Sequence, residues 1–323
     1  MIVIAGSTGV GKTDLALSFG KNLPIEIVNA DLGQFYQPLT IGTAKPAWQQ
    51  ESIKHHLFDI FTTPQTFTSL HYKTVLMETL NDIWKRNKIP VIVGGSTFYI
   101  ESIFFEIAEP EKIYDPVNKP KIDNLLNVDV WNQLNIIDSE RAAAIHPKDY
   151  YRINRALDIW RTTGIKPSTL KPHYNPPARY WFFHLTRDRA ELYARINERV
   201  NQMIDTGWID EVRALINTEW QPFIESKKFI GYSEIIEFLE TNSIARQMVV
   251  NDIAQKTRNY AKRQETYWKR LKKKLSDCLV EPTEYTNKQV SKLFTLDLTK
   301  ANLHVVSKQL SEQLLKEIES SNL

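Results

Sequence analysis

The chain has 323 residues, of which 42% are hydrophobic and 24% are charged, and its formal net charge is +3. This composition excludes a disordered chain, and the length suits one large or two small domains. The single cysteine, Cys278, excludes an internal disulfide and a multi-cysteine zinc site. With no long apolar run and a strand-like segment at 2–5, we expect a soluble, cytoplasmic protein that makes no membrane contact. Nothing indicates an obligate dimer, so a monomer is expected.

The first half of the chain has the pattern of an α/β core. Short apolar runs rich in β-branched residues at 2–5, 25–28 and 89–93 alternate with helix-like stretches such as 14–23. Such runs are typical of buried parallel strands in βαβ units. We therefore assign residues 1–105 to the first part of this core. Four prolines interrupt the polar stretch 106–150, which predicts an inserted helical subdomain there.

Residues 151–323 are predicted to complete the core and to form a helical, basic C-terminal region. One helix opens with a cap pair, Asp188 and Glu191, and ends at Gly207. Its apolar positions 192, 196, 200 and 203 share one face. Further helices are expected at 233–239, about 244–275 and 303–318, with a strand at 293–298.

Positive charge is concentrated in residues 254–275. This segment has nine basic residues and one acid, Glu265, so the remainder of the chain is slightly acidic. Tyr260, Tyr267 and Trp268 lie among the basic residues. A solvated helix face is the alternative, but this charge exceeds what solubility needs, which favours nucleic-acid binding.

Residues 6–13 form a complete Gx4GKT phosphate-loop sequence between a strand run and a helix-like stretch. Its glycines let backbone N–H groups turn toward a phosphate, the lysine adds charge, and a threonine hydroxyl can bind Mg²⁺. The predicted phosphate-binding residues are Gly6, Ser7, Thr8, Gly9, Val10, Gly11, Lys12 and Thr13, with Thr13 as the metal ligand. The motif leaves open which phosphate compound binds.

Two other strand ends carry candidate groups. The run at 89–93 leads into Gly94, Gly95 and Ser96 rather than into the carboxylate typical of a hydrolytic ATPase. The glycines fit either a close backbone approach or an ordinary tight turn. Asp31 follows the run at 25–28, at the sheet edge where ligands bind in such folds. It is a candidate general base, with a helix cap or an indirect Mg²⁺ ligand as the competing interpretation.

Three further residues have the chemistry of ligands. His55 and His56 are adjacent, so they point in different directions and are expected to make structural contacts rather than to chelate one metal. Arg195 lies beside the apolar stripe of its helix, where it either reaches a phosphate or stays on the surface. The spacing alone favours the surface.

Two strings in the chain are highly specific to one enzyme family: Ile41-Gly42-Thr43-Ala44-Lys45-Pro46 and Tyr260-Ala261-Lys262-Arg263-Gln264. Together with the phosphate loop and residues 29–31, 34, 36, 55–57, 93–96, 152–157, 189–193, 195–196 and 230–232, they resemble one enzyme family, the tRNA dimethylallyltransferases. This family is also called the tRNA isopentenyltransferases. The similarity extends from residue 2 to about residue 270.

Members of that family transfer a dimethylallyl group from dimethylallyl diphosphate to N6 of the adenosine at tRNA position 37, beside the anticodon. The resemblance implies that the phosphate loop, Mg²⁺ at Thr13 and Arg195 bind the departing diphosphate. It implies that Asp31 is the general base, that Ser96 orients the amine and that Gln34 reads the base. The catalytic set is thus Asp31, Ser96, Lys12 and Arg195.

The resemblance also implies an interface with the anticodon stem-loop of tRNA, because the adenosine must leave its stack and this cost must be offset elsewhere. The chain departs from the family at Leu32 and Gly33, and at Ser96, where most members have Thr. The expected tRNA-binding residues are Asp31, Leu32, Gly33, Gln34, Ser96, Lys119, Tyr151, Arg152, Arg155, Lys262 and Arg263.

The predicted fold is α/β: a P-loop NTPase-like parallel sheet core with an inserted helical subdomain and a helical C-terminal region. One alternative function is an isopentenyltransferase acting on free adenine nucleotides, which needs neither the insertion nor the basic helix. A P-loop kinase for a nucleotide or small molecule is another, and it does not explain the two specific strings. A non-enzymatic RNA-binding relic is the third.

Overall fold

The computed structural model describes residues 1–106, 129–241, 245–280 and 291–321. It divides into a larger unit, Met1–Ile103 with Pro177–Leu323, and a smaller unit, Phe104–Pro176. Lys119 lies outside the described residues. Among the described helices, none has the length and apolar character needed to cross a lipid bilayer.

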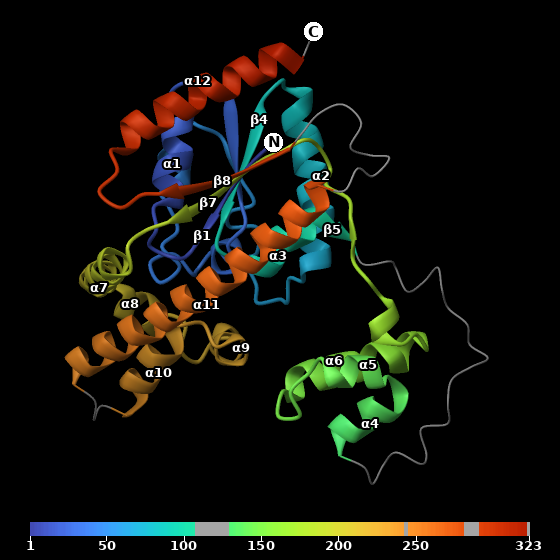
Figure 1. Cartoon of the computed structure of the whole chain (residues 1–323). Helices are drawn as coiled ribbons and strands as arrows, with labels where there is room; N and C mark the ends of the chain where they lie inside the picture. Colours follow the sequence, from blue (N-terminus) through green and yellow to red (C-terminus); the bar gives the residue numbers. More distant parts are fainter. Residues whose placement is uncertain (107–128, 242–244, 281–290, 322–323) are drawn as a thin grey trace. The chain divides into compact units, whose positions relative to one another are not determined.

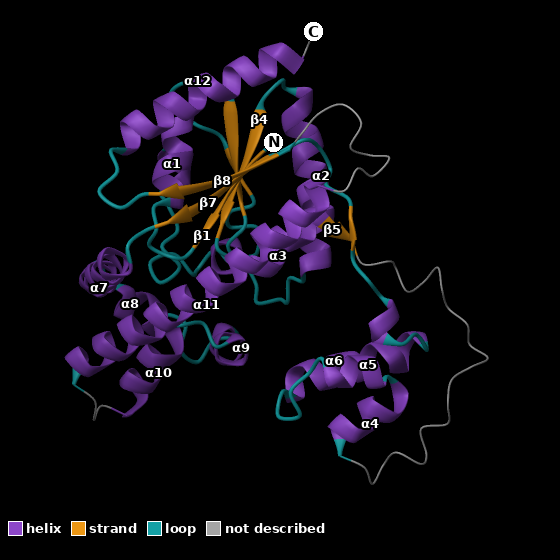
Figure 2. Ribbon diagram, viewed as in Figure 1, coloured by secondary structure: helices purple, strands orange, loops and turns teal. Residues whose placement is uncertain are grey.

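The larger unit contains one sheet and its surrounding helices (Figures 1 and 2). Its strands are β1 (Ile2–Gly6), β2 (Ile25–Asn29), β3 (His55–His56), β4 (Ile89–Gly94), β7 (Trp181–Thr186) and β8 (Lys292–Asp297). Its helices are α1 (Lys12–Phe19), α2 (Ser69–Lys85), α3 (Thr97–Phe104), α7 (Arg189–Asp205), α8 (Trp208–Arg213), α9 (Trp220–Lys227), α10 (Tyr232–Thr241), α11 (Arg246–Val280) and α12 (Leu303–Ser321).

All six strands are parallel, in the order β3-β2-β4-β1-β7-β8. The central strand β1 is buried along its whole length, which is why its sequence is continuously apolar. Ile2 and Ile4 pack on one face against Leu15 and Phe19 of α1 and Leu314 of α12. Helix α2 lies on the other side of the sheet (Figure 1). The expected α/β class with a parallel sheet is confirmed.

The predicted core strands at 2–5, 25–28 and 89–93 are present, whereas other boundaries differ. Helix α1 begins at Lys12 rather than 14, directly after Gly11, whose left-handed conformation is not helical, and it ends at Phe19 rather than 23. Strand β7 and helices α8 and α9 were not predicted. Helix α11 starts at Arg246 and runs to Val280, past the predicted end at 275.

A second apolar core holds the helical C-terminal region together. The predicted stripe on α7 is confirmed, since Val200 and Met203 are buried in this core with Trp208 of α8. Asp188 caps α7 by accepting hydrogen bonds from the N–H groups of residues 190 and 191. Gly207, with φ 105°, ends this helix as predicted and starts the next.

The smaller unit has its own apolar core. Its elements are β5 (Phe105–Glu106), α4 (Val130–Ile137), α5 (Ser139–Ala143), α6 (Tyr150–Thr163) and β6 (His173–Tyr174). Leu134 of α4 packs with Ile153 and Trp160 of α6 in this core. The predicted insertion ended at residue 150, but α6 packs on α4, so the compact unit extends to Pro176.

The two adjacent histidines make structural contacts, as predicted. His55 Nδ1 lies 2.7 Å from the carbonyl oxygen of Ile53, and His56 Nε2 lies 2.6 Å from Oε2 of the buried Glu26. Arg86 donates two hydrogen bonds to the same carboxylate, at 3.0 and 2.7 Å. The hydrogen bond from Arg86 is the main reason that the pKa of Glu26 is lowered to about 2; the contact with His56 adds to it, and burial opposes it.

Replacing this carboxylate should destabilise the fold in a pH-dependent way. Because the pKa is lower in the folded chain, the stabilisation is fully present above about pH 5 and is lost as the pH falls toward 2. At neutral pH, Glu26→Gln should lower the free energy of unfolding by about 1–3 kcal/mol in urea titrations. The exposed Glu78→Gln on α2 is the control. A deficit of Glu26→Gln that stays constant down to about pH 3 would contradict this account.

Candidate active site

The predicted site residues gather where three neighbouring strands end. Strand β1 leads into the phosphate loop, β2 into Asp31, and β4 into Gly95 and Ser96. Since β2, β4 and β1 are adjacent and parallel, their carboxyl ends lie at one edge of the sheet. The sheet topology therefore brings together groups that are up to 90 positions apart in sequence.

The phosphate loop has the backbone that its glycines permit. Gly9 and Gly11 have φ values of 80° and 110°, in the left-handed region that side chains disfavour. Lys12 Nζ folds back over the loop and donates to the carbonyl oxygens of Gly6 at 3.2 Å and Ser7 at 3.1 Å. The loop is thus preformed, with its cation at the centre.

Three arginines from the end of β7 and from α7 support this loop. Arg187 donates to the carbonyl oxygen of Val10. Arg195 Nε donates to the carbonyl oxygen of Gly9 at 3.0 Å, and Arg199 Nη2 donates to Thr8 Oγ1 at 3.3 Å. The spacing favoured a surface position for Arg195, and its side chain is indeed 45% exposed. It also reaches the phosphate loop, which was the other alternative.

Sequence reasoning missed Arg187 and Arg199. Arg199 follows Arg195 by four residues, so both lie on the same side of α7, and this spacing was the available signal. Burial lowers the pKa of Arg199 and of Lys12, and in each case the negative charge of Asp31 opposes the effect. Two partly buried cations therefore lie within electrostatic reach of one carboxylate, an arrangement suited to a polyanionic ligand.

Asp31 is fixed by the turn after β4. Its Oδ1 accepts a hydrogen bond of 2.5 Å from the N–H of Gly95, and its own N–H donates to Asn29 Oδ1 at 2.8 Å. Although Asp31 precedes a short 3₁₀ helix at Leu32–Phe35, its side chain makes no capping bond there. The helix-cap interpretation of this carboxylate is therefore wrong. Ser96 lies close by, with its Oγ accepting from the N–H of Leu32 at 2.9 Å.

The two glycines after β4 allow a close backbone approach. A side chain at Gly94 would overlap the backbone of Ala30. A Cβ at Gly95 would lie 3.3 Å from Asp31 Oδ1 and 3.4 Å from Lys12 Nζ. An ordinary tight turn would not require glycine at both positions. The close backbone approach is therefore the correct interpretation of the glycine pair.

Gln264 of α11 joins the phosphate loop to this turn. It is buried, its Oε1 accepts from the N–H of Thr8 at 2.9 Å, and its Nε2 donates to the carbonyl oxygen of Gly95 at 2.8 Å. One turn earlier, burial and the charge of Asp31 raise the pKa of Tyr260 to about 12. Helix α11 therefore forms one wall of the site, a role that its charge pattern did not predict.

The basic residues of α11 divide into two groups. Lys262 and Arg263, the predicted RNA contacts, are exposed beside Gln264. Lys256 instead pairs with Asp252 and Glu234, and Lys274 pairs with Glu101 of α3. Part of the charge on α11 is thus neutralised by acidic side chains, whereas Arg263 lies over the ring of Tyr260.

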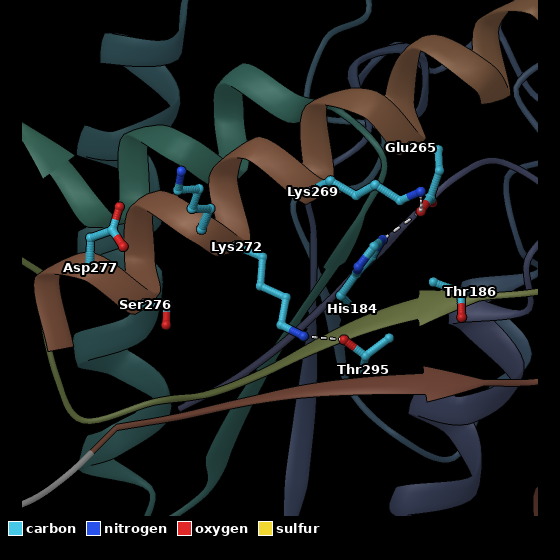
Figure 3. Close-up of a pocket in the computed structure, with 9 residues that line it drawn as sticks. His184, Thr186, Glu265, Lys269, Lys272, Ser276, Asp277 and Thr295 are labelled. Atoms are coloured by element: carbon cyan, nitrogen blue, oxygen red, sulfur yellow. Dashed lines mark hydrogen bonds and ion pairs between the residues drawn. The ribbon is translucent and has the colours of Figure 1, made fainter. Parts of the chain in front are cut away.

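A cavity of about 390 Å³ lies between α11 and the strands β7 and β8 (Figure 3). His184 of β7 contacts Glu265 of α11 there, with 3.3 Å between Nε2 and Oε2. The lining residues are His184, Thr186, Glu265, Lys269, Lys272, Lys273, Ser276, Asp277 and Thr295, and they include none of the predicted site residues.

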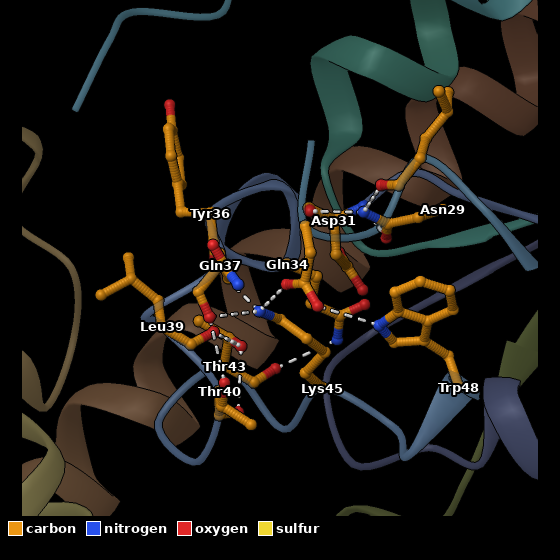
Figure 4. A network of polar contacts seen from close by, with 12 residues as sticks. Asn29, Asp31, Gln34, Tyr36, Gln37, Leu39, Thr40, Thr43, Lys45 and Trp48 are labelled. Carbon is orange, nitrogen blue, oxygen red and sulfur yellow. Dashed lines mark hydrogen bonds and ion pairs between the residues drawn. The ribbon is translucent and has the colours of Figure 1, made fainter. Parts of the chain in front are cut away.

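The specific string at residues 41–46 folds into a loop that positions Gln34 (Figure 4). The Gln34 side-chain amide donates to the carbonyl oxygens of Thr43 at 3.1 Å and Ala44 at 3.3 Å. Lys45 donates to the carbonyl oxygen of Tyr36 at 2.8 Å and forms an ion pair with Asp59. The amide nitrogen of Gln34 is therefore committed to the loop, while the predicted base-reading role stays a prediction.

Glu211 of α8 anchors the start of this loop. Its carboxylate accepts hydrogen bonds from the N–H groups of Thr40 at 3.1 Å and Ile41 at 2.6 Å, and from the hydroxyl of Tyr232 at 2.6 Å. A Cβ at Gly42 would overlap the ring of Trp208. Sequence reasoning missed Glu211, because an isolated glutamate on a helix gives no signal of this function.

Three of the predicted RNA-contacting residues lie in the smaller unit. Tyr151, Arg152 and Arg155 are exposed on α6, and Tyr151 has 81% of its surface accessible. Arg152 forms an ion pair of 3.3 Å with Asp149, which caps the same helix. These residues share one helix, as a binding surface would require; that helix belongs to the smaller unit, whereas Asp31 belongs to the larger one.

The described part of the chain contains no group of three or more His, Cys, Asp and Glu side chains arranged to hold a metal ion. Thr13, the predicted ligand, lies in the first turn of α1, directly after Lys12. A lone hydroxyl fits Mg²⁺ that is bound mainly by ligand phosphates and water, the usual coordination of this ion.

The model of the IPP transferase family matches residues 34–271. The chain belongs to this family. Among its IPP transferase relatives, the tRNA dimethylallyltransferase of Thermotoga neapolitana is 35% identical over 84% of this chain and 89% of its own length. The enzyme of the same name from Fervidobacterium nodosum is 37% identical over 85% and 89%.

Solved structures with the same fold support this assignment. The tRNA isopentenylpyrophosphate transferase of Bacillus halodurans is 26% identical, with a TM-score of 0.64, over 99% of this chain and 97% of that one. A eukaryotic dimethylallyltransferase acting on tRNA is 25% identical, with a TM-score of 0.76, over 99% and 79%. The family similarity expected from the sequence is confirmed.

Removing the Gln264 bridge should destabilise this IPP transferase. Gln264→Leu leaves the Thr8 N–H and the Gly95 carbonyl group without their partner, which should lower the free energy of unfolding by about 1–3 kcal/mol. The exposed Gln255→Leu on the same helix should change it by less than about 0.5 kcal/mol. Urea titration measures both, and equal losses would show that the bridge contributes nothing.

Proposed function

We propose that this protein transfers a dimethylallyl group from dimethylallyl diphosphate to N6 of the adenosine at tRNA position 37. The observation that carries the proposal is the position of Asp31, held by Gly95 within electrostatic reach of the phosphate-loop cation Lys12. A proton acceptor beside an anion-binding loop suits a reaction in which an amine displaces a diphosphate. Membership of the IPP transferase family supports the same chemistry.

The leaving group is assigned to the phosphate loop. Cleavage of the carbon–oxygen bond at the allylic carbon develops negative charge on the diphosphate. The loop N–H groups, Lys12, Arg195 and Arg199 would stabilise that charge, since all are anchored before the ligand binds. When bound at Thr13 and the diphosphate, Mg²⁺ would supply further neutralisation of this charge.

The amine is assigned to the turn after β4, which holds Asp31 through Gly95. As N6 forms its bond to the allylic carbon, one proton leaves the nitrogen and passes to Asp31. Because Gly95 occupies Oδ1, we assign the proton to Oδ2. Ser96 lies on the same turn, where its hydroxyl can orient the amine.

An acceptor assay tests the proposal. Purified protein and Mg²⁺ are incubated with radiolabelled dimethylallyl diphosphate and an anticodon stem-loop hairpin bearing the target adenosine, with AMP, ADP and ATP as competing acceptors. Label in the hairpin alone, absent from a guanosine-substituted hairpin, supports the proposal. Label in free nucleotide, or in no acceptor, would contradict it.

Asp31→Asn should separate binding from chemistry. The amide keeps the shape and the contact with Gly95 but is a far weaker base, so the single-turnover rate should fall about 10²-fold or more. Affinities for the hairpin and for dimethylallyl diphosphate should stay within about two-fold of wild type. The exposed Asp82→Asn on α2 is the control for loss of one charge. Loss of binding in Asp31→Asn would make this residue structural.

Charge reversal on α11 tests the assigned RNA surface. Replacing Lys262 and Arg263 together by Glu should weaken hairpin binding and reduce the slope of log affinity against log salt by about 1–2 units. The matched control reverses Lys308 and Lys316, which are exposed on α12. Equal behaviour of the two double variants would remove α11 from the interface.

A further inference from the structure

An exposed aromatic side chain lies at the edge of the candidate site. Phe98, at the start of α3, has 67% of its surface accessible, so most of this apolar ring faces solvent. Its ring packs edge-on against Tyr267 of α11, with centroids 5.6 Å apart and planes at 70°. Phe98 therefore keeps a defined position although most of its surface faces solvent.

Tyr267, the second ring of this pair, has contacts with two further side chains. The Tyr267 hydroxyl donates to Glu101 of α3, and Glu101 also pairs with Lys274 at 2.9 Å. The guanidinium carbon of Arg270 lies 4.7 Å from the centre of the Tyr267 ring. We name Phe98, Tyr267 and Arg270 the aromatic platform. Its two rings and one planar cation come from two helices: Phe98 and Arg270 contact the ring of Tyr267, whose hydroxyl is hydrogen-bonded to Glu101.

Both helices connect the aromatic platform directly to the reacting groups. Phe98 follows Ser96 by two residues, and Tyr267 follows Gln264 by three, about one helical turn. Ser96 lies beside Asp31, and Gln264 bridges Thr8 and Gly95. The platform is thus rigidly placed relative to the site, whereas none of its three residues takes part in the assigned chemistry.

We propose that the aromatic platform stacks with the base of an unpaired RNA nucleotide next to the target adenosine. This inference rests on the proposed function, because it requires RNA as the substrate. A base extruded from a loop exposes the faces of its neighbours, and proteins that bind unpaired RNA cover such faces with aromatic rings and Arg guanidinium planes. Exposed Phe98, backed by Tyr267 and Arg270, offers that combination.

The charge distribution favours a nucleotide over another occupant. Lys262 and Arg263 are exposed on the same helix about two turns before Arg270, and they suit the phosphates that accompany an unpaired base. A purely apolar partner would leave these cations and Arg270 without anionic partners.

A cycle of protein and RNA changes tests the stacking. The RNAs are the anticodon stem-loop hairpin and two derivatives, each with an abasic nucleotide on one side of the target adenosine. Binding to each is measured by fluorescence anisotropy without dimethylallyl diphosphate, so the readout does not depend on catalysis. The proteins are wild type, Phe98→Ala, Phe98→Trp and the control Val305→Ala, an exposed residue of α12.

For wild type, one abasic hairpin should bind about ten-fold more weakly than the intact hairpin. Phe98→Ala should bind the intact hairpin with a similar loss and should show no further loss with that abasic hairpin. Phe98→Trp should restore both the affinity and the sensitivity to the missing base, since indole also stacks. Val305→Ala should behave as wild type.

Independent losses, in which Phe98→Ala and the abasic change simply add, would overturn the stacking proposal. So would a wild-type protein that is indifferent to both abasic positions. Either result could be obtained with a protein that still prenylates the intact hairpin, so the proposed function would stand. An intact hairpin that wild type neither binds nor prenylates would overturn both.

Discussion

The site depends on one neutral amide. Gln264 accepts from the phosphate loop and donates to the turn after β4, and its partners lie 256 and 169 positions away in sequence. A planar amide carries a donor and an acceptor at fixed separation, so one buried side chain satisfies two backbone groups that would otherwise be costly to bury. The phosphate loop, the Asp31 turn and α11 thereby become a single rigid assembly.

Positive charge exceeds negative charge within this assembly, as suits the binding of an anionic ligand. Lys12 and Arg199 lose solvation by burial, and Asp31 compensates only part of that loss. Partly buried cations without sufficient counter-charge weaken a fold, and a bound polyanion removes the penalty. The same arrangement strengthens electrostatic interactions at the site, because water is displaced from around the charges. Arg195, which remains nearly half exposed, can adjust to the ligand.

The specificity of the string at 41–46 has a packing explanation. Gly42 lies against the ring of Trp208, as does Gly231 near the start of α10, so side chains at these positions would displace the indole. The carboxylate of Glu211 accepts hydrogen bonds from three backbone N–H groups at the start of the loop. Side chains of the helical C-terminal region therefore shape this loop by contacting its backbone.

The parallel strands, the phosphate loop and the position of Asp31 could be predicted from the sequence, because each depends on a local pattern: a continuous apolar run, the placing of glycines and the end of a strand. The sequence did not reveal strand β7, whose aromatic-rich apolar run lacks a distinctive period. The sequence could not predict that Arg199 supports the loop, that Gln264 bridges two strand ends or that Glu211 anchors a turn. Each of these side chains acts on a backbone group far away in the chain, and only the completed packing brings such partners within hydrogen-bond distance.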